Sequence, residues 1–166
     1  MSEQNDNKKD NLHELIAGFD TAMLVTLDPV APAGRPMAIA EHNEESGMLV
    51  FSTSLDTEKV DEIKNNSTTA VVMQSATTFV SLTGECVVSN DREKIRSLFD
   101  KSWELWYPEG PEQSDIRLLE FTPVLGEYWD ISGTKGIRFA WQAGKALLKG
   151  EGLKPKEGLH HAETAL

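Results

Sequence analysis

Residues 78–89 have the sequence Thr-Phe-Val-Ser-Leu-Thr-Gly-Glu-Cys-Val-Val-Ser, and this stretch decides the fold class. Apolar and polar residues alternate along it. One face would carry Val80, Leu82, Cys86 and Val88, and the other Ser81, Thr83, Glu85 and Ser89. A period of two is typical of a β-strand with one buried face. Gly84 interrupts the apolar face, which predicts a bulge or a bend at that point.

Other short apolar segments on both sides of this strand are separated by turn-rich sequences. We expect strands at 22–27, 35–42, 48–53, 69–74, 116–121 and 124–131, with 137–141 as a candidate last one. Turns are expected at 28–34 and 44–47. Strands joined by short turns indicate an antiparallel meander and not βαβ units. The predicted fold is therefore mainly β with peripheral helices: a split β-barrel of six to seven antiparallel strands.

Helices are expected at the periphery of this barrel. The predicted helices are one starting at Asn11, a short one at 56–66, and a longer one from residue 90 or 91 to Trp106. A disordered lead-in is expected over 1–10, one domain over 11–149 and a flexible tail over 150–166.

Composition narrows the classes of function. The 166-residue chain has a formal net charge of −11, which disfavours binding to nucleic acids or anionic membranes. Cys86 is the single cysteine, so an intrachain disulfide and a cysteine metal cluster are excluded. The polar N-terminal sequence lacks a signal-peptide core and no apolar run is long enough to cross a bilayer, so a cytoplasmic location is expected.

The most informative segment for function is 51–59, Phe-Ser-Thr-Ser-Leu-Asp-Thr-Glu-Lys. It joins the end of a strand to the start of a helix through a hydroxyl-rich turn, a combination that can bind an anion. Lys59 would lie in the first helical turn, where a cation opposes the helix dipole unless an anion is bound. The alternative is that Ser54, Asp56 and Thr57 only cap the helix while Lys59 pairs with a nearby carboxylate.

Two further groups of residues have both a structural and a functional interpretation. Arg35, in the tripeptide Arg35-Pro36-Met37, could reach the same anion or be a solvated side chain on an edge strand. Trp103, Trp106 and Tyr107 are expected to be core or interface anchors first and ring-stacking residues second.

Other chemistries have little support in the sequence. His13, His42, His160 and His161 do not form a ligand set with carboxylates at metal spacing, so no metal site is expected. A glycine-rich phosphate loop, a nucleophile elbow and a dinucleotide fingerprint are all lacking. No residue is an evident acid–base catalyst, and the catalytic residues are unknown. A redox cofactor would supply the chemistry instead.

An ordered series of motifs resembles the pyridoxamine 5′-phosphate oxidase-like family, and within it the general stress protein branch. The motifs are Arg35-Pro36-Met37, Leu49–Thr53, Lys59–Ile63, Val80–Gly84, Asp91-Arg92, Trp106–Gly110 and Glu127–Asp130. The resemblance covers about residues 12–149. It implies a homodimer that holds FMN at the subunit interface, with FAD or another flavin as an alternative.

The resemblance also implies which residues contact the cofactor. Those expected along the flavin are Arg35, Pro36, Met37, Phe51, Ser52, Thr53 and Ser54. Lys59 and the Thr57 hydroxyl would contact the phosphate, and Trp106 would lie near the flavin, from either subunit. Gln74 and Ser81 are weaker matches to the same site.

The chain departs from the family pattern in two places. The C-terminal segment lacks the arginine-bearing substrate motif of true pyridoxamine phosphate oxidases, so oxidation of the vitamin is not expected. Glu58 beside a phosphate would weaken binding. The expected function is flavin-dependent oxidation or reduction of an unknown small substrate. The alternatives are a non-catalytic flavin-binding stress protein, acting as a carrier or sensor, and a structural dimer with no cofactor.

Overall fold

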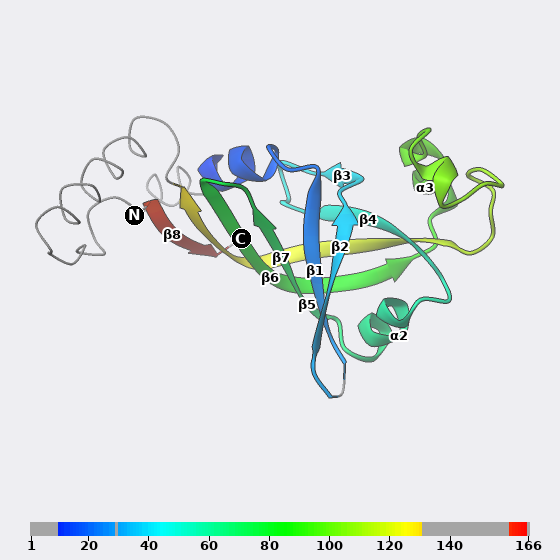
Figure 1. Ribbon diagram of the computed structural model, residues 1–166, viewed down its shortest axis with the longest axis horizontal. Coiled ribbons are helices and arrows are strands. Elements are labelled where there is room, and N and C mark those ends of the chain that lie inside the picture. The colour runs from blue at the N-terminus through cyan, green and yellow to red at the C-terminus, as the bar shows by residue number, and fades with distance from the viewer. Residues whose placement is uncertain (1–9, 29, 131–159, 166) are drawn as a thin grey trace, which may run out of the picture.

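Strand β6 (Thr78–Ser89) lies at the centre of a single curled sheet (Figure 1). The computed structural model describes residues 10–28, 30–130 and 160–165. The other strands are β1 (Thr21–Leu27), β2 (Pro32–Ala38), β3 (Glu41–His42), β4 (Leu49–Ser54), β5 (Thr68–Gln74), β7 (Ile116–Asp130) and β8 (His160–Ala165). Their order across the sheet is β2-β1-β5-β6-β7-β4-β3, every pairing is antiparallel, and β8 pairs with β7. The predicted mainly β split barrel is confirmed.

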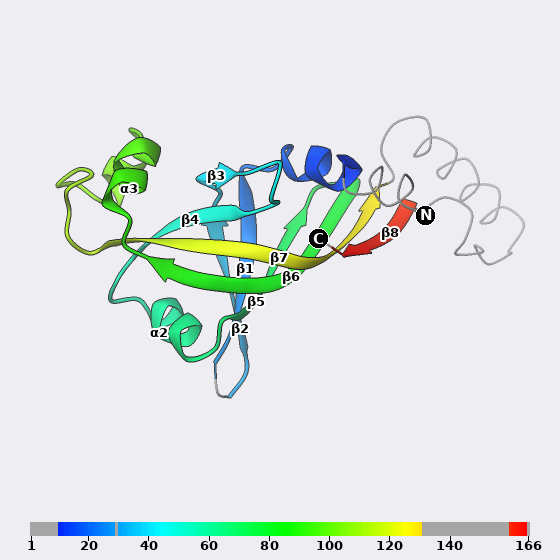
Figure 2. The ribbon, with the colours of Figure 1, turned by 180° about the vertical axis from the view of Figure 1, so that it is seen from behind.

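Short helices lie around this sheet. They are a helical segment over residues 10–16, α2 (Glu58–Asn65), α3 (Arg92–Leu98) and a 3₁₀ turn, η1 (Trp103–Leu105). Figure 2 shows β6 and β7 running together across the molecule, with α2 on the opposite side of the sheet from α3. The described residues contain no helix with the length and apolar character that a bilayer crossing needs.

The bulge predicted at Gly84 is present. The register between β6 and β7 shifts between Thr83 and Gly84, so Val124 has no partner in the ladder. A side chain at position 84 would collide with the neighbouring backbone, since an added Cβ would lie 2.8 Å from the Cα of Pro123. Glycine is therefore required by close packing and not by a special backbone dihedral.

Strand β7 is one continuous element, and the prediction of two strands separated at Pro123 was wrong. Pro123 lies at the bulge, where the ladder is already interrupted, so its missing N–H breaks nothing further. The predicted strand 35–42 is likewise divided into β2 and β3, and Pro32 to Gly34, expected in a turn, belong to β2. An edge strand such as β2 tolerates proline because one side of it has no partner.

The prediction of one long helix up to Trp106 was also wrong. Helix α3 ends at Leu98, and the separate turn η1 follows it. The Asp100 carboxylate accepts hydrogen bonds at 2.6 Å from the backbone N–H and the hydroxyl of Ser102, which starts the new turn. At the C-terminus, residues 160–165 form β8 against β7 within the segment predicted to be a tail. A strand held by backbone pairing does not require apolar side chains, and the low apolar content of this segment therefore did not indicate a strand. The candidate strand 137–141, residues 1–9 and the rest of the tail lie outside the described residues.

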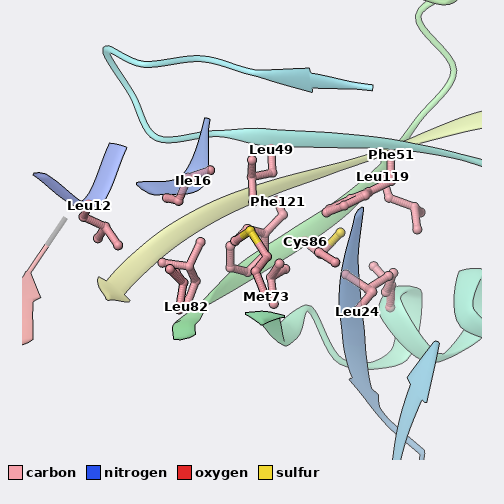
Figure 3. Close-up of a cluster of buried hydrophobic side chains, with 14 of the residues drawn as sticks. Leu12, Ile16, Leu24, Leu49, Phe51, Met73, Leu82, Cys86, Leu119 and Phe121 are labelled. Carbon is pink, nitrogen blue, oxygen red and sulfur yellow. The ribbon is translucent and has the colours of Figure 1, made fainter. Parts of the chain in front are cut away.

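The main core lies on the concave side of the sheet. Figure 3 shows side chains from the N-terminal helix and from β1, β4, β5, β6 and β7 meeting there. The fully buried members labelled in the figure include Leu12, Leu24, Phe51, Met73, Leu82, Cys86 and Phe121. Leu12 and Ile16 attach the N-terminal helix to this core. Burial raises the pKa of the Cys86 thiol to about 12, so this thiol is unreactive.

A second buried cluster lies on the other face of β4 and β7, beneath α3 and η1. Its members are Val50, Ile95, Trp103, Tyr107, Ile116 and Leu118. Strand β4 therefore separates two cores: Phe51 and Thr53 point into the first, while Ser52 and Ser54 lie on the side of the second. Because β4 contacts both cores, the end of β4 and the start of α2 lie where the two cores adjoin.

Candidate functional site

The side chains of Thr53, Thr57 and Lys59 meet where β4 leads into α2. The Lys59 ammonium donates a hydrogen bond to Thr53 Oγ1 at 3.1 Å, and the hydroxyls of Thr53 and Thr57 are 3.1 Å apart. Thr57 also donates to the backbone carbonyl of Ser54 at 2.9 Å. Three hydroxyl or ammonium groups thus line one short stretch of chain.

The two structural alternatives predicted for this segment do not hold. Thr57 is the N-cap residue of α2, yet its side chain makes no capping hydrogen bond to the helix. Lys59 has no carboxylate oxygen within 4.0 Å of its ammonium in the described part of the chain. A half-buried lysine without a carboxylate partner, next to a helix N-terminus, is suited to binding an anion.

Arg35 approaches the same segment from β2. Because side chains alternate along a strand, Arg35 and Met37 lie on the inner face, opposite Leu24 and Ala22 of β1, while Pro36 faces outward. The Arg35 guanidinium donates to Thr26 at 2.6 Å and to Glu62 of α2 at 2.7 Å. Arg35 is thus not the solvated side chain that the alternative predicted, since its exposed fraction is 21%.

The electrostatics of the segment follow from these contacts. Burial, and then the positive charge of Arg35, lower the pKa of Lys59, while Glu62 and Glu58 oppose that shift. Burial raises the pKa of Glu62, but the hydrogen bonds from Arg35 and Thr26 outweigh it and the net shift is downward. The site therefore holds an ionised carboxylate beside its cations.

The remaining predicted residues lie in three other places. Ser52 and Ser54 face the second cluster, where Ser52 forms a hydrogen bond with the buried Tyr107. Gln74 and Ser81 lie on the outer face of β5 and β6. Trp106 follows η1 and is 73% exposed. In the described part of the chain, no hydrogen bond or ion pair joins Gln74, Ser81 or Trp106 to Lys59.

Sequence reasoning missed Thr26 and Glu62, which complete the network around Arg35. Glu62 belongs to the Lys59–Ile63 motif, and its position three residues after Lys59 places both on one face of a helix, but neither signal assigns it a role. A charged residue at such a position is usually solvated. Nothing in the local sequence of Thr26 distinguishes it from other polar residues of a strand.

Solved structures with the same fold match this chain at low sequence identity. A candidate general stress protein 26 from Jannaschia sp. CCS1 is 21% identical, with a TM-score of 0.71 over 98% of this chain and 99% of that one. A Clostridium acetobutylicum protein related to general stress protein 26 is 22% identical, with a TM-score of 0.66 over 75% and 89% of the two chains. The general stress FMN/FAD binding protein of Xanthomonas citri is 20% identical, with a TM-score of 0.63 over 81% and 93%.

The structural neighbours support the fold alone, because their identities are below 25%. No curated protein sequence matches this chain. The family model described as "Pyridoxamine 5'-phosphate oxidase like" matches residues 7–154, which include every strand from β1 to β7 and the whole Arg35–Lys59 segment. The chain therefore belongs to the pyridoxamine 5′-phosphate oxidase-like family.

Proposed function

We propose that this protein binds a flavin through its phosphate group, with FMN as the preferred form. The observation that carries the proposal is the half-buried Lys59 ammonium, which has a hydroxyl partner and no carboxylate partner in the described part of the chain. The chemistry of the donors fits a phosphate, which accepts hydrogen bonds from ammonium, hydroxyl and backbone N–H groups. A structural neighbour named as an FMN/FAD binding protein adds support from fold similarity.

Each group would have a definite role in holding the cofactor. Lys59 and Thr57 would bind the phosphate, and Thr53 would orient the Lys59 ammonium through their hydrogen bond. Met37, Ser52 and Ser54, which are half-buried, would lie along the rest of the molecule, whereas Phe51 is fully buried in the main core and could offer only its backbone. A bound flavin would supply the electron-transfer chemistry for which the side chains of the site offer no substitute.

The cofactor sites are proposed to lie between two copies of the chain. Among the described residues, the outer face of β1, β5 and β6 exposes large apolar side chains, each at least 37% exposed: Met23, Leu27, Val72, Phe79 and Val87. Met23 is paired with Val72 across the sheet, so the side chains of these two residues lie next to each other. Gln74 and Ser81 belong to the same face, which supports their placement at a subunit interface.

A flavin titration tests the proposal. Purified protein is titrated into FMN while flavin fluorescence is recorded, for wild type, Lys59→Ala and Lys64→Ala. Lys64 is an exposed lysine of the same helix and serves as the matched control. We expect saturable binding by wild type and Lys64→Ala and a loss of at least tenfold in affinity for Lys59→Ala. Failure of wild type to bind FMN would refute the proposal, and a parallel titration with FAD ranks the two cofactors.

The proposed activity is flavin-dependent oxidation or reduction of a small molecule. Non-catalytic flavin binding, as a carrier or sensor, is the second candidate, favoured by the commitment of the ionisable groups Arg35 and Glu62 to each other. The two are separated by mixing the FMN-loaded protein with NADH or NADPH and following bleaching of the flavin absorbance. Repeated reduction and reoxidation favours the enzyme, whereas stable colour favours the carrier.

A further inference from the structure

A closed ring of hydrogen bonds joins β1, β2 and α2 beside the proposed phosphate site. Arg35 Nη1 donates to Thr26 Oγ1 at 2.6 Å, Thr26 Oγ1 donates to Glu62 Oε2 at 2.5 Å, and Arg35 Nη2 donates to Glu62 Oε1 at 2.7 Å. Each of the three side chains contacts both others. The ring therefore fixes the guanidinium and the carboxylate relative to each other.

The ring is largely withdrawn from water. The Glu62 side chain is 9% exposed and that of Arg35 21%, while Thr26 is fully buried. A carboxylate in such a place keeps its charge only because of the hydrogen bonds and the positive charge that it receives. A permanent negative charge thus lies on the helix that presents Lys59 to the anion.

Arg35 is consequently committed before any ligand arrives. Its Nη1 donates to Thr26 and also reaches the backbone carbonyl of Ala33 at 3.3 Å, and its Nη2 donates to Glu62. The carboxylate of the exposed Glu58 also lies 4.0 Å from Arg35 Nη2. Two cations, Arg35 and Lys59, are thus accompanied by two carboxylates, Glu62 and Glu58, and the four formal charges sum to zero.

We propose that Glu62 is an affinity-setting residue: it holds Arg35 in position and opposes the charge of the bound phosphate, so that the ligand is exchangeable. The inference rests on the proposed function for the identity of the ligand, because the phosphate is taken to be that of a flavin. A site in which both cations were free would hold a phosphate dianion far more tightly. The carboxylate of Glu62 weakens that attraction and occupies one donor of Arg35, but it leaves the donors of Lys59 in place.

Replacement of Glu62 by glutamine tests this role. Glutamine keeps the shape of the side chain, can accept from Arg35 and can bond Thr26, but it carries no charge. The probe is inorganic phosphate, followed by NMR of the Lys59 ammonium and by calorimetry, and FMN is titrated in parallel. We expect Glu62→Gln to bind phosphate about tenfold more tightly than wild type, which is the effect of one unit charge at short range in a partly buried site. The pKa of Lys59 should fall further, because Glu62 raises it.

Two other variants keep the test decisive if Glu62→Gln folds poorly. Glu58→Gln alters an exposed side chain at the same site and should strengthen phosphate binding in the same direction by about two- to threefold. Glu14→Gln, an exposed change on the N-terminal helix, should leave the affinity unchanged. Thermal unfolding of each variant shows whether it is folded.

The outcomes separate this inference from the proposed function. If Glu62→Gln is folded and binds phosphate no better than wild type, or if Glu58→Gln fails to strengthen binding, the affinity-setting role is refuted. If phosphate binding strengthens as expected but neither protein binds FMN, the flavin proposal fails while the role of Glu62 stands. Absence of phosphate binding to every folded variant would refute the role of Glu62, and the parallel FMN titration would then decide the flavin proposal separately.

Discussion

Gly84 lies so close to Thr122 that a Cβ added at position 84 would be 2.1 Å from the Thr122 carbonyl oxygen. The obstacle is backbone of the neighbouring strand, which cannot rotate away as a side chain could. We therefore expect Gly84→Ala to destabilise the protein by about 3 kcal/mol, the upper range for overpacking, as measured by urea unfolding. Gly34→Ala is the matched control, because a Cβ there would meet Met23 at an ordinary 3.4 Å. A similar loss in both variants would contradict this explanation.

The bulge at Gly84 shows how far the sequence predicts the fold. Alternation placed β6 at its observed bounds, because each of its residues follows one rule for which face it occupies. The same reasoning divided β7 at Pro123, since proline lacks the N–H that a ladder requires. That N–H is dispensable only because β7 bulges at Val124, next to Pro123, where its register with β6 shifts. This is a property of the pair of strands that neither segment shows alone.

The contrast between Lys59 and Glu62 shows how far the sequence predicts the candidate site. The position of Lys59 in the first turn of α2 followed from local capping signals, which depend on a few neighbouring residues. Glu62 has a function only because Arg35 and Thr26 reach it from two strands distant in sequence. Contacts of this kind depend on strand order, and helix periodicity does not predict them.

Loss of the Arg35 side chain should leave Glu62 buried and uncompensated. We expect Arg35→Ala to cost about 3 kcal/mol of unfolding free energy at pH 7, as is typical when one partner of a buried ion pair is removed. The pKa of Glu62 lies below 4.5 in the wild type, so its stabilising contribution is present above that pH and is lost as the pH falls. In Arg35→Ala, burial should raise the pKa of Glu62 instead. The difference in unfolding free energy between the variant and the wild type should therefore shrink as the pH falls.

Urea unfolding at pH 7 and pH 4 measures both parts of this prediction. Arg96→Ala is the control, because the Arg96–Glu112 pair is exposed and its loss should have no measurable effect at either pH. Equal destabilisation by the two variants would show that the Arg35–Glu62 pair behaves as a surface pair.

His42 should make stability depend on pH in a separate and higher range. Its ring nitrogen Nε2 lies 3.3 Å from Nδ1 of His13, and the two rings stack. Burial and then His13 lower the pKa of His42 below 6.5, with Glu44 opposing. The folded state therefore binds fewer protons than the unfolded state near this pH, so stability is complete above 6.5 and declines as the pH falls below it. We expect His42→Gln to flatten the pH dependence of the urea midpoint between pH 7.5 and 5.5, and an unchanged slope would exclude His42 as its source.

Replacement of Trp103 should lower stability, whereas replacement of Trp106 should weaken ligand binding without changing stability. Trp103 is 7% exposed and packs against Tyr107 and Phe99, so Trp103→Ala should cost about 3–5 kcal/mol. Trp106 is 73% exposed, and Trp106→Ala should leave the unfolding midpoint unchanged. Flavin titration of Trp106→Ala should nevertheless show weaker binding, because the family resemblance implies that this exposed indole lies near the flavin, where it could contact the ring. Unaltered affinity would remove Trp106 from the proposed site.

The outer face of β5 and β6 provides the test of the proposed dimer. Val72 pairs with Ser81 at the centre of the exposed apolar group, and a carboxylate there would be buried without a partner in any interface that used this face. We expect Val72→Glu to sediment as a monomer and to bind FMN more weakly, while its unfolding midpoint changes little because Val72 is 37% exposed in the single chain. Ser97→Glu, at an exposed polar position of α3 that is not part of this face, is the matched control and should remain dimeric. If Val72→Glu sediments as a dimer, the interface must lie on another face and the assignment of Gln74 and Ser81 to the site falls with it.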